Sequence, residues 1–281
     1  MKFSSSALLA AALLQLASFP LGNAFQPGAC VFRTPHETAL QSSFGVEQAI
    51  PSDMPDIDPV SVTAKDLRSV AVTNVDGERV LLGDAMGRGT SIVVFLRHLG
   101  CFWCWSYAKA WMGLQQEIAG AEEITGPIFV SIGDPDRLND FLEKNPNIPR
   151  NQIFVDGYDF KAYRQAGFGR FDEKPKELIA DVNPQPVVLG GFQGWKTFLS
   201  SFMTLAPVTE DMKFPEMLSP EGIMWVGGTF VVRDNDMVYR WNDRIAGDHP
   251  EASEVLKVAK EAGSVPRKKG LSFQNLFGLL G

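Results

Sequence analysis

The fold class of this chain depends on one stretch of sequence, Ser91-Ile92-Val93-Val94-Phe95-Leu96-Arg97-His98-Leu99-Gly100-Cys101-Phe102-Trp103-Cys104. Its first six residues form a continuous apolar run rich in β-branched side chains, which is typical of a strand buried on both faces of a sheet. The residues that follow, Trp105 to Ile118, are predicted to form a helix. Cys101 and Cys104 therefore lie at a strand-to-helix junction, where the unpaired amides of a helix N-terminus favour a thiolate over a thiol. We interpret this junction as a candidate redox centre.

A Cys-x-x-Cys pair is also compatible with two other kinds of site. His98, Cys101 and Cys104 could supply three ligands to a metal, with His249 as the fourth. Zinc and iron-sulfur sites usually take four protein ligands, however, and a second cysteine pair is missing. The other alternative is a pair of buried thiols that pack as small hydrophobic side chains. Redox chemistry is the interpretation that the sequence favours.

The spacing of the two thiols suggests how such a centre would work. Across one helical turn, the two sulfurs are close enough to form a disulfide. Cys101, at the helix start, is predicted to be the more exposed and more acidic thiol, hence the nucleophile, and Cys104 the thiol that resolves its adduct. With a peroxide substrate Cys101 becomes a sulfenic acid that condenses with Cys104, and with a disulfide substrate it forms a mixed disulfide. Both reactions need an external thiol or dithiol electron donor and no bound cofactor.

Residues beside the pair have two interpretations each. Arg97 either stabilises an anionic thiolate or peroxide oxygen, or is an outward-facing charge at the strand end. His98 either donates a proton or is simply hydrogen-bonded. Four aromatic residues also surround the pair, namely Phe102, Trp103, Trp105 and Tyr107. They either bind an apolar substrate or pack under loops, and the sequence favours partial packing.

The segments around the dithiol predict an α/β fold. Buried strands alternate with helices, and a hairpin is expected at each end of this alternation. In chain order the expected elements are strands 70–73 and 78–82, strand 91–96, helix 105–118, strand 128–132, helix 136–143, strand 153–155, helix 160–166, strands 228–232 and 237–241, and helix 251–262. This order implies a thioredoxin-like mixed sheet with helices on both faces. An irregular insertion at 181–222, with one amphipathic helix at 195–203, precedes the last hairpin.

Composition divides the 281 residues into five parts. The expected boundaries are a signal peptide at 1–24, a transit peptide at 25–50, a linker at 51–64, the thioredoxin-like domain at 65–265 and a basic, apolar tail at 266–281. The tail begins with Arg267-Lys268-Lys269-Gly270 and then becomes apolar. It is expected to dock on the domain itself or on a partner in a protein complex.

The N-terminus has the layout of a secretory signal peptide, with Lys2, an apolar run at 7–14 and small residues before a cleavage point at Ala24. An amphipathic N-terminal helix is the alternative. Cleavage would expose Phe25, followed by a stretch bearing Ser and Thr. This resembles the bipartite presequences of algae with secondary plastids and implies the chloroplast stroma as destination. Plain secretion is the alternative.

Charge and cysteine content exclude several classes of protein. The net charge of −7 argues against nucleic acid or an anionic membrane as partner. No segment approaches the roughly 20 apolar residues that a membrane span needs. Three cysteines, with Cys30 in the presequence, are too few for a disulfide-stapled secreted fold. They favour a compartment in which thiols cycle.

Four segments together resemble the peroxiredoxin-like 2 proteins, also described as the AhpC/TSA-type antioxidant enzyme domain. They are the active-site segment 95–104, the Asp-containing segment 154–168, the Gly-Gly-Thr strand 227–232, and an Arg-x-x-x-Asp-His element ending in Asp248-His249. The resemblance covers roughly residues 65–262 and implies a thioredoxin fold with thiol-dependent antioxidant or reductase activity. It assigns the redox pair to Cys101 and Cys104. Some relatives are linked to reduction of prostaglandin-type endoperoxides, which implies lipid peroxides as candidate substrates.

Two departures separate the chain from better-known branches of the superfamily. Peroxiredoxins place Pro seven and Thr three residues before the peroxidatic cysteine, and Val94 and His98 occupy those positions here. Thioredoxins carry Trp-Cys-Gly-Pro-Cys and a cis-proline before a late core strand, whereas this strand opens with Gly227-Gly228. We therefore expect a thiol-dependent oxidoreductase that acts on peroxides or disulfides. The alternative is a non-enzymatic thioredoxin-fold subunit of a plastid complex.

Overall fold

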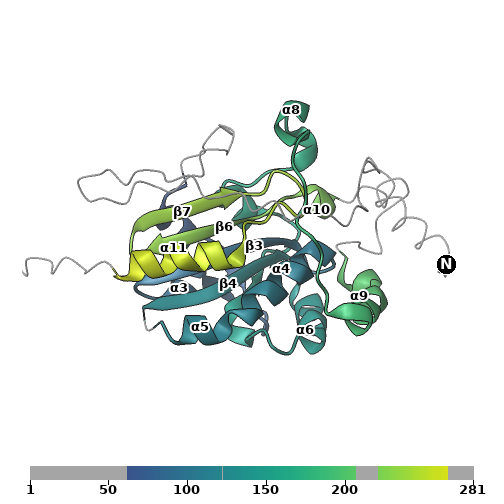
Figure 1. Cartoon of the computed structure of the whole chain (residues 1–281), viewed down its shortest axis with the longest axis horizontal. Helices are drawn as coiled ribbons and strands as arrows, with labels where there is room; N and C mark the ends of the chain where they lie inside the picture. Colours follow the sequence, from purple (N-terminus) through teal and green to yellow (C-terminus); the bar gives the residue numbers. More distant parts are fainter. Residues whose placement is uncertain (1–61, 122, 207–220, 265–281) are drawn as a thin grey trace, which may run out of the picture.

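The computed structural model describes residues 62–121, 123–206 and 221–264, which build one layered α/β unit (Figure 1). The predicted signal peptide, transit peptide and C-terminal tail lie outside the described residues, as does the linker up to residue 61. Within the described ranges, none of the helices is long and apolar enough to cross a membrane.

A single seven-stranded sheet runs through the molecule in the order β2-β1-β5-β4-β3-β6-β7. The central strands β3, β4 and β5 are parallel, while β6 pairs antiparallel with β3 and β7 pairs antiparallel with β6. At the other edge, the β1–β2 hairpin joins the sheet through an antiparallel contact of β1 with β5. The strands are β1 Ala71–Thr73, β2 Arg79–Leu81, β3 Thr90–His98, β4 Ile124–Ile132, β5 Ile153–Val155, β6 Gly228–Arg233 and β7 Asp236–Asn242.

Helices cover both faces of this mixed sheet. The helices are α2 Ala64–Arg68, α3 Leu82–Met86, α4 Phe102–Gly113, α5 Gln115–Ala119, α6 Pro135–Lys144, α7 Lys161–Gln165, α8 Lys176–Ile179, α9 Gly191–Leu205, α10 Glu221–Met224 and α11 Ala252–Ser264. One face packs under α4, α5, α6, α9 and α11, and the opposite face under α2, α3 and α7. The predicted thioredoxin-like fold, with a mixed sheet, helices on both faces, an N-terminal hairpin and a last hairpin, is confirmed, and the structure places one hairpin at each edge of the sheet.

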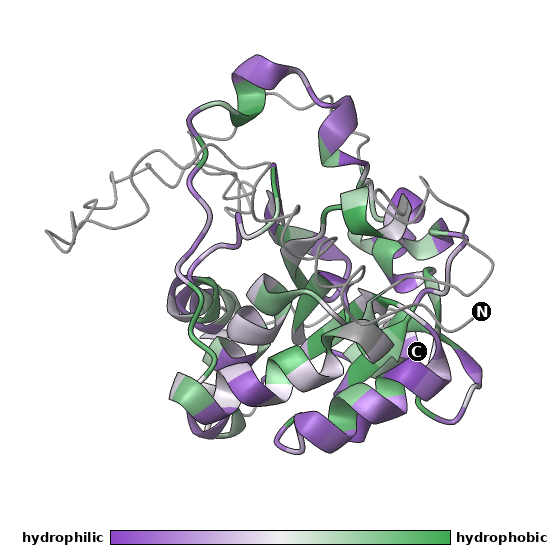
Figure 2. Cartoon of the chain, turned by 90° about the vertical axis from the view of Figure 1, so that its right-hand side faces the viewer, coloured by the Kyte–Doolittle hydropathy of each residue, from purple (hydrophilic) through white to green (hydrophobic). Residues whose placement is uncertain are grey.

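The central strand β3 shows why these residues form a two-sided core. All nine of its residues are buried, and successive side chains of a strand point to opposite faces. Ile92, Val94 and Leu96 therefore pack into one apolar cluster, and Val93 and Phe95 into the other. Figure 2 shows hydrophobic residues concentrated along the inner strands, whereas the outer helices carry many hydrophilic residues.

Two expectations about helices were wrong. The helix predicted over 105–118 is two helices, because the chain breaks at Leu114, where the backbone amide bonds the Trp111 carbonyl in a tighter turn. Gly113, directly before the break, is a weak helix former. The short helices α2, α3, α8 and α10 were missed, because four or five residues are too few to show a helical period.

Candidate dithiol site

Both cysteines lie at the N-terminus of α4, at the end of the central strand β3. Cys101 is the N-cap residue, with extended backbone angles, and its carbonyl accepts from the Trp105 amide at 3.0 Å. Cys104 follows in the first turn of the helix. Both are free thiols in this structure. The predicted strand-to-helix junction therefore places the two thiols one turn apart.

The expected difference in exposure between the two thiols is almost absent. Cys101 is 3% exposed and Cys104 is 2% exposed, so both are buried. The chain after α9 packs closely on the neighbouring Gly100, where an added Cβ would lie 2.8 Å from the Ala206 amide nitrogen. Because this contact comes from the irregular insertion, local sequence around the pair could not reveal it.

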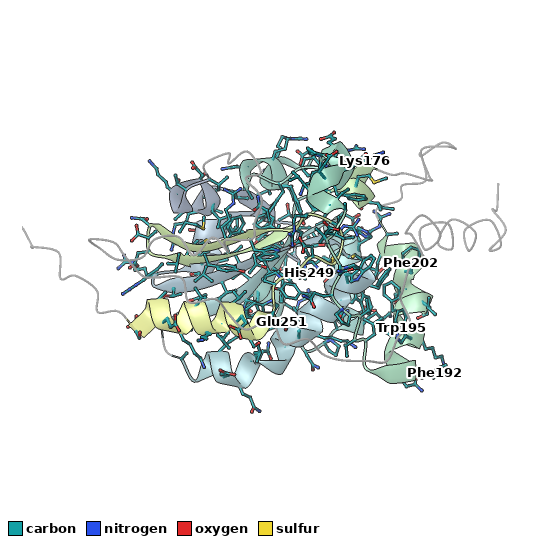
Figure 3. All side chains as sticks on the ribbon, turned by 45° about the horizontal axis from the view of Figure 1, so that its top comes forward. Lys176, Phe192, Trp195, Phe202, His249 and Glu251 are labelled. Atoms are coloured by element: carbon teal, nitrogen blue, oxygen red, sulfur yellow. The ribbon has the colours of Figure 1, made fainter. Side chains whose placement is uncertain are left out.

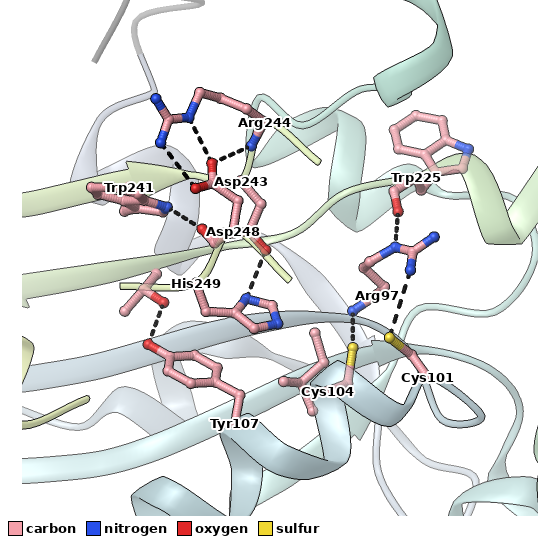
Figure 4. A network of polar contacts seen from close by, with 12 residues as sticks. Arg97, Cys101, Cys104, Tyr107, Trp225, Trp241, Asp243, Arg244, Asp248 and His249 are labelled. Carbon is pink, nitrogen blue, oxygen red and sulfur yellow. Dashed lines mark hydrogen bonds and ion pairs between the residues drawn. The ribbon is translucent and has the colours of Figure 1, made fainter. Parts of the chain in front are cut away.

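Arg97 contacts both sulfurs, as Figure 4 shows. Its backbone amide donates to Cys104 Sγ at 3.2 Å, and its guanidinium Nη1 donates to Cys101 Sγ at 3.6 Å. The side chain is 4% exposed, so the outward-facing alternative for Arg97 was wrong. It also donates through Nε to the Trp225 carbonyl at 3.1 Å and through Nη2 to the Ile223 carbonyl. A buried guanidinium needs a negative partner, and the Cys101 thiolate supplies one.

The surroundings shift the pKa values of the two cysteines in opposite directions. Burial alone raises the pKa of Cys101, but the hydrogen bond from the Cys104 thiol and the positive charge of Arg97 outweigh it and lower the pKa to about 5. Burial and the hydrogen bond to Cys101 raise the pKa of Cys104 well above its ordinary range. At neutral pH the site therefore holds one thiolate beside one thiol.

His98 is also buried beside the pair. Burial, followed by the nearby charge of Arg97, lowers its pKa well below the ordinary value for histidine. Its Nδ1 atom has no hydrogen-bond partner among the described residues. His98 is therefore neutral at physiological pH.

The aromatic residues next to the dithiol are divided between core and surface. Trp105 and Tyr107 are buried in the core, whereas Phe102 and Trp103 are partly buried, with ring centroids 4.1 Å apart. The Phe102 ring also lies 6.5 Å from that of Trp195 on α9. Figure 3 shows α9 at one side of the molecule, where Phe192 is 81% exposed. Partial packing, as the sequence favoured, describes this group.

Sequence reasoning missed the buried acid that pairs with His249. Asp243, directly after β7, lies with its Oδ2 atom 2.8 Å from Nδ1 of His249. The neighbouring Asp248 instead binds Arg244, whose Nε and Nη2 donate to its carboxylate at 2.7 and 2.9 Å. The one available signal was the charged pair Asp243-Arg244 following a strand of apolar and aromatic residues.

The metal alternative has no support from the geometry of the described residues. In those ranges, no group of three or more His, Cys, Asp or Glu side chains could hold a metal ion. His249, the fourth ligand in that alternative, turns its Nδ1 atom to Asp243.

Comparisons with known proteins give only distant likenesses. No protein-family model and no curated protein matches the sequence. Among solved structures, the chain is similar to the peroxidoxin BcpB of Mycobacterium tuberculosis, at 13% identity and a TM-score of 0.40, over 68% of this chain and 91% of that chain. Peroxiredoxin Q of Xanthomonas campestris gives 13% identity, a TM-score of 0.40, and coverage of 73% and 98%. A SCO1/SenC family lipoprotein of Bacillus anthracis gives 13%, 0.38, and coverage of 70% and 94%.

These TM-scores are too low to bear on the fold or on function. The fold assignment rests on the strand order and the connections of the sheet.

Proposed function

We propose that this protein is a thiol-dependent oxidoreductase that reduces peroxides or disulfides through Cys101 and Cys104. The observation that carries the proposal is the asymmetry of the pair. One sulfur is held as a thiolate beside Arg97, while the other, one helical turn away, keeps its proton. A nucleophilic thiolate next to a protonated resolving thiol is the arrangement that dithiol chemistry requires.

With a peroxide ROOH, the Cys101 thiolate attacks the terminal oxygen and the O–O bond breaks. Cys101 becomes a sulfenic acid and the alkoxide RO⁻ leaves, taking up a proton to give ROH. Cys104 then attacks the sulfenic sulfur, water leaves, and the two cysteines form a disulfide. An external thiol or dithiol donor returns two electrons and restores the pair. Arg97 stabilises the thiolate before the attack and the anionic oxygen that departs.

With a disulfide substrate, the first step forms a mixed disulfide with Cys101 and expels a substrate thiolate. Cys104 then attacks the Cys101 sulfur and releases the second substrate thiol. Both reactions end in the same Cys101–Cys104 disulfide. The state of the protein after one turnover is therefore the same for both substrate classes, and the rate of disulfide formation distinguishes them.

The test is mass spectrometry of the purified full chain after addition of sub-stoichiometric peroxide. We expect rapid loss of two hydrogens from the peptide that contains both cysteines, and slow loss would favour disulfides as substrates. Cys101→Ser should abolish thiol-dependent turnover, whereas Cys104→Ser should retain one sulfenic acid. Cys30→Ser is the matched control, because this third cysteine lies outside the predicted domain. Unchanged turnover in the Cys101 variant would remove the proposed mechanism.

A second candidate function is that of a non-enzymatic subunit of a larger complex. Exposed apolar side chains on and before α9 favour it, since Val188, Phe192 and Leu199 are 67%, 81% and 65% exposed. Large exposed apolar patches often mark protein interfaces. A protein without a redox-active disulfide that co-fractionates with a large assembly would establish this function instead.

We also propose that the protein acts in the chloroplast stroma, reached through the signal and transit peptides at residues 1–50. The proposal rests on the small residues before Ala24 and on Phe25 after the cleavage point. A fluorescent protein fused behind residues 1–50 should enter the plastid of an alga with secondary plastids. In Phe25→Ala, import of the fusion should stop before it reaches the stroma. Secretion of the unmodified fusion would contradict the proposal.

A further inference from the structure

A second buried charged pair lies beside the dithiol. Asp243 follows β7 and His249 precedes α11, and their side chains are 0% and 3% exposed, with Nδ1 and Oδ2 2.8 Å apart. The Tyr107 ring of α4 stacks on the imidazole, with centroids 4.5 Å apart and planes 9° apart. The Tyr107 hydroxyl is itself hydrogen-bonded to Thr229 of β6. Contacts from the loop and from α4 therefore fix the position of the imidazole ring.

The second ring nitrogen of His249, which Asp243 does not contact, is the nitrogen that could exchange a proton with the dithiol. Its Nε2 atom is buried and has no hydrogen-bond partner among the described residues. In Figure 4 this edge of the ring faces the side on which Cys104 and Arg97 lie. A buried nitrogen without a partner is destabilising, so its retention calls for an explanation. A proton that binds and leaves with the redox state of the pair is such an explanation.

The titratable groups around His249 lie on the loop after β7, at the dithiol, on α4 and at Lys174. The loop supplies Asp243 and also Asp248, whose charge is paired with Arg244. The dithiol side supplies the Cys101 thiolate and the Arg97 guanidinium. Lys174 donates to the Asp243 carbonyl at 2.8 Å, and Tyr107 contributes no charge because burial raises its pKa.

The Cys101 thiolate is one of the two negative charges that favour a protonated His249. In the reduced protein, the negative Cys101 and Asp243 face the positive Arg97, the positive Lys174 and a protonated His249. Burial lowers the pKa of His249, but the Asp243 carboxylate and the Cys101 thiolate together raise it above its ordinary value. A disulfide removes the thiolate charge, which leaves burial and Arg97 to oppose the imidazolium.

We propose that His249, held in place by Asp243, stores one proton while Cys101 is a thiolate and releases it when Cys101 and Cys104 form a disulfide. This inference rests on the proposed dithiol function. It makes His249 a positioning and proton-storing residue for the reaction.

The stored proton completes the balance of peroxide reduction. Reduction of ROOH to ROH and water consumes two electrons and two protons. The Cys101 thiolate and the Cys104 thiol supply both electrons as they become a disulfide. Cys104 supplies one proton, which leaves in the water, and His249 supplies the other, which neutralises the departing alkoxide. The site thus holds every proton that one turnover needs.

The test measures the pH dependence of the midpoint potential of the Cys101–Cys104 couple in the full chain, from its equilibrium with a thiol redox buffer whose own potential is known at each pH. Between the pKa values of His249 in the oxidised and reduced states, formation of the dithiol takes up two protons for two electrons. We expect the equilibrium constant of this couple at a fixed potential to change about a hundredfold per pH unit in this window, which is a change of about 60 mV in midpoint potential. In His249→Asn only Cys104 takes up a proton, and the change should fall to about tenfold, or about 30 mV.

His98→Asn is the matched control, because it removes the other buried histidine of the site, whose pKa is lowered and which stays neutral. It should keep the hundredfold dependence. A second measurement avoids variants altogether, since NMR titration of the ring protons of His249 should give a higher pKa in the reduced than in the oxidised protein.

The outcomes separate this inference from the function on which it rests. A reversible disulfide with the same tenfold dependence in the unmodified protein and in His249→Asn would overturn the proton role and leave the dithiol function standing. Equal pKa values of His249 in both redox states would overturn it as well. Absence of any reversible Cys101–Cys104 disulfide would instead contradict the proposed function itself.

Discussion

Arg97 joins the dithiol to a distant part of the chain through a single side chain. Its guanidinium contacts Cys101 Sγ at 3.6 Å and also donates to the Trp225 carbonyl at 3.1 Å. A planar guanidinium with five donors can satisfy several acceptors at fixed angles, which a lysine ammonium does less well. The geometry of the thiolate therefore depends on where the residues before β6 hold this arginine.

The acidity of Cys101 should depend on this contact. Replacing Arg97 by Gln removes the positive charge beside the sulfur, so the pKa of Cys101 should rise from about 5 by between roughly one and three pH units. The pH dependence of iodoacetamide alkylation measures this pKa directly. Arg97→Lys should show a smaller rise, and Arg150→Gln, an exposed arginine away from the site, should show none. An unchanged pKa in Arg97→Gln would contradict the role of the charge.

Single residues also show how far sequence reasoning reached. The positions of Cys101, Cys104 and Arg97 could be predicted, because a Cys-x-x-Cys pair after a buried strand is a local pattern. The Asp243–His249 pair could not, because its partners are linked through a loop whose path depends on packing against α4. The low exposure of Cys101 was missed for a similar reason, since the neighbouring Gly100 packs against Ala206, which is distant in the sequence.

At the scale of elements, β6 reaches β3 through a close backbone approach. A Cβ added at Gly227 would lie 1.8 Å from the Phe95 carbonyl oxygen, so no other residue fits there without a shift of the chain. Gly228 is similarly close to the Trp241 carbonyl oxygen. Gly227 therefore lets the chain approach β3 closely, and Gly228 lets β6 approach β7.

Gly227→Ala should destabilise the protein, because the added methyl forces β6 and β3 apart at their point of closest approach. We expect the free energy of unfolding to fall by about 1–3 kcal/mol or more. Urea denaturation followed by circular dichroism measures the change. Gly113→Ala is the control, because a Cβ there meets nothing within 4 Å. In a helix, Ala should stabilise by up to about 1 kcal/mol, so equal effects of the two substitutions would contradict the steric explanation.

Elements with a clear period were predicted well and short ones were not. The strand 91–96 and the helix 136–143 appear as β3 and α6, extended by a few residues at their ends. The start of α6 follows from its capping, since Asp134 accepts from the Arg137 amide and Pro135 occupies the first turn. Strand order had no local signal, because it depends on pairings between distant segments.

At the scale of the whole molecule, the thiolate links stability to pH. The pKa of Cys101 is about 5 in the folded protein, below the ordinary value that it regains on unfolding. Between these two values the unfolded chain binds more protons at this residue, so its contribution to stability rises with pH. This contribution is fully present above the unfolded pKa and is lost as the pH falls through about 5.

Comparison with Cys101→Ser isolates this contribution from other titrating groups. The difference in unfolding free energy between the reduced protein and Cys101→Ser should widen as pH rises from about 5, by up to about 1.4 kcal/mol per pH unit. His249 opposes the trend, because its raised pKa gives stability that is lost as pH rises through the folded value. Urea denaturation under reducing conditions between pH 5 and 8 measures the difference. A difference in unfolding free energy between the two proteins that stays constant with pH would contradict a buried thiolate.

The near-complete burial of both sulfurs gives the molecule a means of kinetic selection. For the proposed reaction, an oxidant or a reductant reaches Cys101 when the surrounding structure opens locally, so the expected rate is the intrinsic rate multiplied by the open fraction. A small oxidant needs a small and frequent opening, whereas a protein disulfide needs a large and rare one. The free energy of local opening, and not the acidity of the thiol alone, therefore sets which reactants this centre meets.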